Sequence, residues 1–460
     1  MGFGRYGIII KMTMPAKMLN KLERYLFYFL LFAIPFQTRK ILWYQSWNFN
    51  EWQSASLYGT DILLLILFGF WIFSRVKPKI EKYDYFLFAL VAISAISIKN
   101  SSSHVLSAYN VLKLTEFVFF YFYLKNYAVG KFGLMRPMIV LICGGLFQAV
   151  IAILQFLKQS SLGLGLLGES VLAPNLTGVA SFYNLNGEKI IRAYGTTPHP
   201  NILSAYLFLA IFSFYFVYLY FNIYHKDKVY YKKFNFFLLI SYPLILLSFF
   251  FTFARVTVFL WFSGFIVRAS LILNIQRFRK IFGVGVNKLK LTKILIISTM
   301  VVVLFGIFYW SEAISRVKIS SGEEAVQLRI FYNKESLKSL NWFGVGSGNF
   351  VNWLLLKEPN LPRNLYQPVH NIYLLIYSET GILGITVFIL FLVFLVKDFI
   401  ASTKMDKLYH YSFLTMFLSF LFIGLFDHFL WTLQQGRLMF WLLCAVLTIF
   451  KNGDMIEAQQ

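Results

Sequence analysis

The sequence predicts an all-α polytopic integral membrane protein with about 12 transmembrane helices. Of its 460 residues, 58% are hydrophobic and only 14% are charged, whereas soluble domains average about 45–50% and about 25%. Apolar runs long enough to cross about 30 Å of hydrocarbon recur along the whole chain. This composition excludes a soluble globular enzyme and a disordered protein. The two cysteines, Cys143 and Cys444, lie in apolar runs and predict neither a disulfide framework nor a metal site.

The apolar runs divide the chain into three sets of spans. Their centres lie near Leu30, Leu65, Ala89, Phe117, Gly145, Leu209, Leu244, Phe262, Val302, Phe388, Phe420 and Ala445. Residues 1–157 hold the first five spans, 199–310 hold the next four, and 371–460 hold the last three and a cytoplasmic tail. Two long segments, 158–198 and 311–370, separate these sets, and loops of such length are usually functional.

The distribution of positive charge predicts the topology. The formal net charge is +23, and most of the 43 Lys and Arg residues fall in loops that share one side when the N-terminus is cytoplasmic. This is the pattern of the positive-inside rule, so both termini are expected in the cytoplasm and both long segments outside. The membrane explains the charge, and no nucleic-acid partner is needed to account for it.

The first long segment ends in the sequence RAYGTTPHPN at 192–201. Pro198 and Pro200 favour extended backbone before them, and Pro200 with Asn201 can begin a helix. His199 is then held in a stiff frame at the start of a span. A structural cap and turn with a satisfied histidine explains this motif equally well.

The second long segment predicts an amphipathic helix of about 16 residues that begins near Glu324 and lies on the membrane surface or over the bundle. A rough apolar stripe defines its buried face. The stripe consists of Val326, Ile330, Leu337 and Leu340. Arg329 and Tyr332 lie one helical turn apart. The glycine-rich stretch 341–350 follows and predicts tight turns; no strand precedes it, which argues against a nucleotide-binding loop.

Five further residues carry charge or a titratable ring next to apolar sequence. His370 begins the sequence HNIY at the outer mouth of a span, where an imidazole can titrate near neutral pH. Glu379 is nine residues later and therefore on the opposite helical face, so it is not expected to orient His370. Arg255 lies between two spans with no acidic neighbour in sequence, so it is expected to face a cavity, a partner or an anion, unless it extends to the outer surface. Lys113 and Glu116, three residues apart, predict an ion pair within one helix.

These features resemble the bacterial superfamily of O-antigen ligases and O-antigen polymerases, which also includes O-linked oligosaccharyltransferases. The similarity is densest between residues 162 and 384 and rests on the order and spacing of five motifs. They are RAYG with PHPN at 192–201, TFAR at 252–255, the helix that carries Arg329, GVGSGNF at 344–350, and HNIY with ETGILG at 370–384. Ala254 departs from the family, which often has serine there. The resemblance implies a GT-C-like glycosyltransferase fold.

What the resemblance implies is lipopolysaccharide biosynthesis at the bacterial inner membrane, with a periplasmic active site. The donor would be a glycan on undecaprenyl diphosphate, and the favoured activity is an O-antigen ligase that transfers it to lipid A–core. A polymerase of lipid-linked repeats, an O-linked protein oligosaccharyltransferase and a transporter of lipid-linked glycans remain alternatives. The resemblance makes His370 the base and Arg255, Arg329, Arg192 and Arg316 the ligands of the donor diphosphate. Supporting roles fall to His199, Asn201, Asn371, Tyr373 and Glu379.

The expected reaction is a metal-independent single displacement with inversion and without a cofactor. Arginine binds phosphate oxygens in a bidentate manner and can replace a divalent cation on the departing diphosphate. The outer acidic residues are scattered and contain no Asp-x-Asp pair that would hold such a cation. They include Glu51, Asp61, Glu169 and Glu188.

Overall fold

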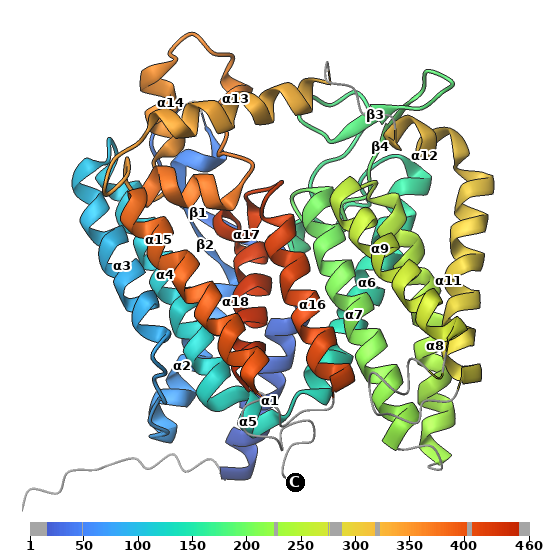
Figure 1. Ribbon diagram of the computed structural model, residues 1–460. Coiled ribbons are helices and arrows are strands. Elements are labelled where there is room, and N and C mark those ends of the chain that lie inside the picture. Colours follow the sequence, from blue (N-terminus) through green and yellow to red (C-terminus); the bar gives the residue numbers. More distant parts are fainter. Residues whose placement is uncertain are drawn as a thin grey trace, which may run out of the picture.

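The computed structural model describes residues 16–449 except 48, 225–228, 275, 277–287, 318–322 and 403–406. The predicted cytoplasmic tail lies outside the described residues. The described chain is mostly helical, and its long helices run between two ends of the molecule (Figure 1). The first helices are α1 (Ala16–Phe32), α2 (Gly59–Ser74), α3 (Asp84–Ser97), α4 (His104–Tyr123), α5 (Val129–Phe132), α6 (Met135–Lys158), α7 (Pro200–Tyr224), α8 (Val229–Phe251) and α9 (Arg255–Leu273). The later ones are α11 (Lys288–Phe308), α12 (Trp310–Val317), α13 (Glu324–Lys338), α14 (Phe350–Lys357), α15 (Ile372–Ala401), α16 (Lys407–Ile423), α17 (Phe429–Thr432) and α18 (Gln434–Ile449).

Every predicted span centre lies within one of these helices. Among the described residues, seven helical stretches are long and apolar enough to cross a membrane. They are His104–Phe132, Met135–Lys158, Pro200–Ile223, Lys233–Phe251, Arg255–Ile272, Lys288–Phe308 and Ile372–Ala401. The shorter α2 and α16 are also apolar. The structure therefore agrees with an all-α membrane protein, and the count of 12 crossings stays a prediction.

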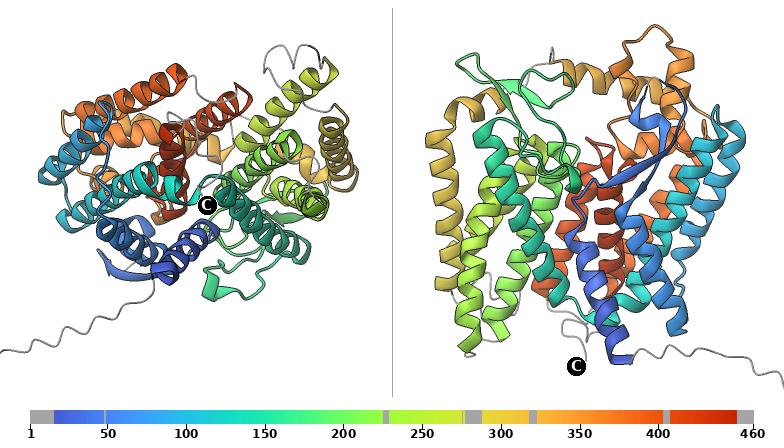
Figure 2. Two further views of the ribbon diagram at one scale, coloured as in Figure 1. Left: turned by 90° about the horizontal axis from the view of Figure 1, so that it is seen from below. Right: turned by 180° about the vertical axis from the view of Figure 1, so that it is seen from behind.

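Small residues allow the helices to pack closely. On α6, Gly144 faces Tyr206 of α7, and a Cβ atom at Gly145 would lie 2.5 Å from the Cβ atom of Ala210 on the same helix α7. Such residues let helix backbones approach within a bilayer, where packing rather than the hydrophobic effect drives association. Elsewhere α3 packs on α15 and α4 on α18 (Figure 2).

The two long segments and the connection from α1 to α2 gather at one end of the molecule (Figures 1 and 2). The first long segment contains an antiparallel hairpin of β3 (Ser181–Tyr183) and β4 (Lys189–Ile191). A third ordered segment, which the sequence did not predict, joins α1 to α2 as a hairpin of β1 (Arg39–Tyr44) and β2 (Ser54–Tyr58). These two short hairpins add a few strand residues to an otherwise helical membrane protein. Aromatic and aliphatic residues that favour strands make up most of β1, but the run is too short to stand out in a hydropathy profile.

Helix α13 lies over the bundle, which is one of the two arrangements that the sequence predicted. The prediction of its buried face, however, is wrong. Ile330, Leu337 and Leu340 are 43%, 56% and 62% exposed. The buried residues of α13 are Tyr332, Glu335 and Ser336. The reason is that α13 covers polar groups: the Tyr332 hydroxyl donates to the Leu365 carbonyl at 2.6 Å.

The glycine-rich stretch is bound to a kink in α15. Gly381 interrupts this helix with φ +73°, and the freed backbone groups there pair with residues 341–346. Val345 N donates to the Ser378 carbonyl at 2.9 Å, and Ile382 N donates to the Asn341 carbonyl at 3.1 Å. A Cβ atom at Gly381 would overlap the Trp342 carbonyl group. This contact fixes the outer segment on the helix that begins just after His370.

We predict that Gly381→Ala lowers the free energy of unfolding by about 2 kcal/mol or more, because the new Cβ meets backbone atoms at a positive φ. The measurement is thermal unfolding of the detergent-solubilised protein. Gly69→Ala in α2 is the matched control, since a Cβ atom there meets nothing within 4 Å. Equal melting temperatures for the two variants would contradict this account of the kink.

Candidate functional site

The sequence-predicted arginines converge at the end where the loops gather. Arg255 begins α9, and its Nη1 lies 2.8 and 2.9 Å from the two carboxylate oxygens of Glu323, while its Nε donates to the Arg316 carbonyl at 2.7 Å. Arg316 Nη1 lies 3.9 Å from the same carboxylate. Burial disfavours the charge of Glu323, but Arg255 above all, with Arg316 and Arg329, lowers its pKa. The partner that Arg255 was expected to need is thus Glu323.

Arg192 holds the turn that presents Arg255. Its Nε donates to the Thr252 carbonyl at 2.6 Å, next to Phe253, which adopts a φ of +46°. Such a conformation is rare for a bulky residue and needs fixed partners. Burial and the nearby charge of Arg316 lower the pKa of Arg192 to about 9. Arg192 is therefore already bound to protein groups, which makes it a positioning residue for Arg255 rather than a free cation.

A histidine–carboxylate cluster lies beside the arginines. It consists of His370, Asp427 and His428, whose ligand-type atoms all lie within 4.8 Å of one another. The rings of His370 and His428 stack with centroids 4.9 Å apart. His428 Nδ1 and Thr432 Oγ1 are 2.7 Å apart, whereas His370 Nδ1 is buried without a hydrogen-bond partner. One imidazole nitrogen of the cluster is thus available to a ligand.

Asn201 connects the arginines to this cluster. Its Oδ1 accepts from Arg192 Nη2 at 2.6 Å, and its Nδ2 donates to Asp427 Oδ2 at 2.7 Å. Its backbone N–H donates to His199 Nδ1 at 3.2 Å. The PHPN motif therefore joins the two clusters through a neutral amide, while His199 takes part in the turn.

The electrostatics of the cluster favour neutral imidazoles and a charged carboxylate. Burial lowers the pKa of His428 to about 3, with a further contribution from His370. Burial likewise lowers the pKa of His199 to about 3 and lowers that of His370. Burial opposes the charge of Asp427, but His428, His370 and His199 lower its pKa to about 2. At neutral pH the three rings are therefore uncharged and the carboxylate is charged.

The same donor set is chemically suited to a divalent metal ion. Two imidazoles and one carboxylate are common ligands of zinc and of other transition metals. Within the described part of the chain, His370, Asp427 and His428 are the one group of three such side chains close enough to share an ion. The sequence predicted no metal site, whereas the structure brings these three side chains together.

A polar cavity lies on the side of the histidines that the β1–β2 hairpin covers. Its lining includes Trp52 and Ser56 from the hairpin segment, Tyr109 from α4, and Thr432 and Arg437 from the last two helices. Trp52 meets the His428 ring edge-on with centroids 4.8 Å apart. The Tyr109 hydroxyl donates to the Ser56 carbonyl at 2.7 Å. The cavity therefore shares a wall with the histidine cluster.

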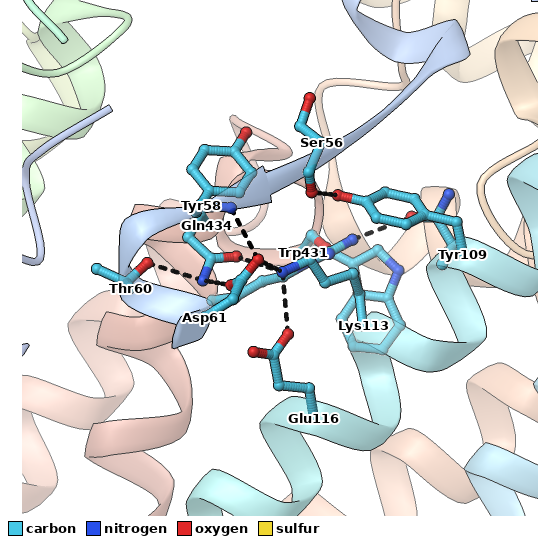
Figure 3. A network of polar contacts seen from close by, with 11 residues as sticks. Ser56, Tyr58, Thr60, Asp61, Tyr109, Lys113, Glu116, Trp431 and Gln434 are labelled. Atoms are coloured by element: carbon cyan, nitrogen blue, oxygen red, sulfur yellow. Dashed lines mark hydrogen bonds and ion pairs between the residues drawn. The ribbon is translucent and has the colours of Figure 1, made fainter. Parts of the chain in front are cut away.

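A buried ion network adjoins this polar cavity through Lys113 and Gln434, which belong to the lining (Figure 3). Lys113 Nζ lies 2.6 Å from Asp61 Oδ2 and 2.9 Å from Glu116 Oε2, which confirms the predicted pair and adds a second carboxylate. Gln434 accepts from Lys113 at 3.2 Å and donates to Asp61. The side chains of Lys113 and Asp61 are only 4% and 5% exposed. Charges buried at this depth need such mutual compensation.

The remaining predicted site residues fall into two groups. Asn371 and Tyr373 hold the helix that presents His370: Asn371 Oδ1 accepts from the backbone N–H groups of Tyr373 and Leu374, and the Tyr373 hydroxyl donates to the Leu421 carbonyl. Glu379 lines the polar cavity and is hydrogen-bonded by Gly348 N–H and Trp431. None of these three directly contacts His370 in the described hydrogen-bond network.

Arg329 lies near both the arginine cluster and the histidine cluster. It lies on α13, near enough to lower the pKa of His370 and of Arg316. Its Nε is buried without a hydrogen-bond partner. One turn further, Tyr332 meets the His370 ring with centroids 5.7 Å apart. Helix α13 therefore contributes to both clusters.

Sequence reasoning missed Asp427 and His428. The signal was present, because this adjacent acid and imidazole interrupt an otherwise apolar sequence between the last two spans. A polar pair in such a position is a candidate functional site by default. Their proximity to His370 across the fold, however, is visible only in three dimensions.

Comparison with models of known protein families found no match to the chain, and a search of curated proteins found no match either. The case for a function therefore rests on the geometry and chemistry described above.

We predict that the protein loses stability as the pH falls from 7 to 5. In the unfolded chain the histidines bind protons below about pH 6.5, whereas in the folded chain His199 and His428 stay neutral down to about pH 3. The unfolded state thus binds more protons, which for His428 alone removes about 2 kcal/mol by pH 5. Melting temperatures across this range test the expectation, and His428→Gln should flatten the dependence. A stability that is constant or rises toward pH 5 would contradict it.

Proposed function

We propose that the protein is a glycosyltransferase of the O-antigen ligase type, which moves a glycan from undecaprenyl diphosphate to a hydroxyl of lipid A–core on the periplasmic side of the bacterial inner membrane. The observation that carries the proposal is the joining of an arginine cluster to a histidine–carboxylate cluster through Asn201, at one end of a bundle of apolar helices. Transfer of a glycan from a diphosphate requires a cation for the leaving group and a base for the nucleophile, close to each other.

The arginine cluster provides for the leaving group. Both carboxylate oxygens of Glu323 accept from Arg255 Nη1, at 2.8 and 2.9 Å, so this guanidinium group already holds an anionic group. Arg316 and Arg329 add positive charge close by. In this proposal the donor diphosphate takes the place of the Glu323 carboxylate, and these guanidinium groups stabilise the negative charge that develops on it.

The histidine cluster provides for the nucleophile. The oxygen of the acceptor hydroxyl attacks the anomeric carbon, its proton passes to His370, and the bond from carbon to phosphate oxygen breaks with its electron pair on the departing undecaprenyl diphosphate. Asp427 stabilises the imidazolium that forms. A single displacement of this kind inverts the anomeric configuration and needs no metal ion or other cofactor.

An apolar cavity of about 510 Å³ supports the proposal that the donor is lipid-linked. It lies between α7, α9, α11 and α16, and its lining includes Phe208 and Leu260. These residues are two turns or fewer beyond Asn201 and Arg255 on the same helices. A polyprenyl chain would lie in this cavity while its diphosphate remains at the arginines. A transporter of lipid-linked glycans would use the same cavity but would not need the base.

We expect His370→Ala to reduce glycan transfer at least about 100-fold while the variant still binds the lipid-linked donor, because a positioned base contributes 10²–10⁴-fold. The assay uses the protein in nanodiscs with undecaprenyl-linked glycan and lipid A–core. His104→Ala, an exposed histidine at the start of α4, is the control and should retain wild-type rates.

Two results would overturn this assignment. Loss of donor binding alone in His370→Ala, by a protein whose wild type transfers no glycan, would favour the transporter. Transfer that stops with EDTA and returns with Mn²⁺ or Zn²⁺ would make His370, Asp427 and His428 metal ligands instead of a base and its partners.

The choice of acceptor is tested by competition. With lipid A–core and a second lipid-linked repeat offered together, we expect a single addition to lipid A–core. A ladder of products on one lipid carrier would instead identify a polymerase, and labelling of a protein acceptor an O-linked oligosaccharyltransferase.

A further inference from the structure

The polar cavity beside the histidines has the chemistry of a sugar-binding site. It combines the aromatic rings of Trp52 and Tyr109 with hydroxyl, amide and guanidinium groups. Sugars present apolar ring faces to aromatic side chains and hydroxyl groups to such polar ones. Ser56 is 4% exposed, and its buried Oγ has no hydrogen-bond partner. A buried hydroxyl without a partner is unfavourable unless a ligand or water satisfies it.

The charged side chains around the cavity already have protein partners, which favours a neutral ligand. Arg39 pairs with Glu51 at 2.7 Å and Lys113 pairs with Asp61 and Glu116, whereas Arg437 donates to the Trp431 carbonyl and to Asn110 Oδ1. A phosphate or a free cation would find its counter-charge already bound. A sugar hydroxyl can hydrogen-bond to either sign without breaking these pairs.

The position of the cavity is as specific as its chemistry. Thr432 and Trp52 belong to its lining and contact His428, whereas Asn201 contacts Asp427 and leads to Arg192. The histidine cluster therefore has the arginines on one side and the polar cavity on another. In a single displacement the nucleophile must approach the anomeric carbon opposite the leaving group, so the acceptor must enter from a side that the diphosphate does not occupy.

We propose that this polar cavity binds the acceptor sugar, the residue whose hydroxyl attacks the donor. The inference rests on the proposed glycosyl transfer and names the site of its second substrate. At about 60 Å³ the cavity has room for a few ordered waters. The hydroxyl groups of one sugar residue replace these waters, while the rest of the acceptor glycan extends outward past the β1–β2 hairpin.

The test measures the KM for lipid A–core, and for a lipid-linked repeat if the wild type prefers it, at saturating undecaprenyl-linked glycan. Trp52→Ala should raise this KM at least tenfold, and Ser56→Ala about threefold or more, while donor binding stays within twofold of wild type. Trp47→Ala is the matched control, because Trp47 lies in the same hairpin segment, is 92% exposed and is not part of the lining. Its acceptor KM should not change.

Ser56→Ala separates binding from structure. Removing a buried hydroxyl that has no protein partner should not lower the melting temperature, so a purely structural role predicts no effect on KM. If Trp52→Ala does not fold, Ser56→Ala alone decides. An acceptor KM within twofold of the Trp47→Ala value in the folded cavity variants would overturn the inference and leave the transfer reaction intact. A wild-type protein that transfers no glycan would overturn the proposed function, and this inference with it.

Discussion

The side-chain amide of Asn201 is the interaction on which the site depends. It accepts from the buried guanidinium group of Arg192 and donates to the half-buried carboxylate of Asp427, which lies 226 residues further along the chain. A direct ion pair between Arg192 and Asp427 would neutralise both charges. The amide instead gives each group a hydrogen-bond partner and keeps the two charges separate. The arginines can then act on an anion while Asp427 acts on the histidines.

Compensation of charge is the common feature of this end of the protein. Arg255 rests on Glu323, and Lys113 on two carboxylates, so little net charge is buried although many ionic groups are. Where the dielectric constant is low, burying an unpaired charge costs much free energy, and a charge that has a counter-ion is held firmly in place. This explains how a membrane bundle can hold a dense polar site at one end without losing its apolar packing.

The sequence predicted the helices well, because a run of apolar residues at the length of the bilayer has few other solutions. It also predicted Arg255, His370 and Asn201 as residues of one region, and these do converge. It failed for Asp427 and His428, whose role depends on distance in space, and for the β1–β2 hairpin, whose strands are too short for a hydropathy signal. The predicted face of α13 was wrong because the rule assumes an apolar surface below the helix, whereas Tyr332 covers polar backbone.

Helix α13 carries a geometric constraint of its own. Glu323, just before it, holds Arg255, and Tyr332, within it, lies against His370. Each residue inserted between them would turn one contact by about 100° relative to the other and shift it by about 1.5 Å along the axis. The number of residues from Glu323 to Tyr332 therefore fixes the distance between the arginine cluster and the histidine cluster. An insertion or deletion within this helix would therefore move one cluster relative to the other.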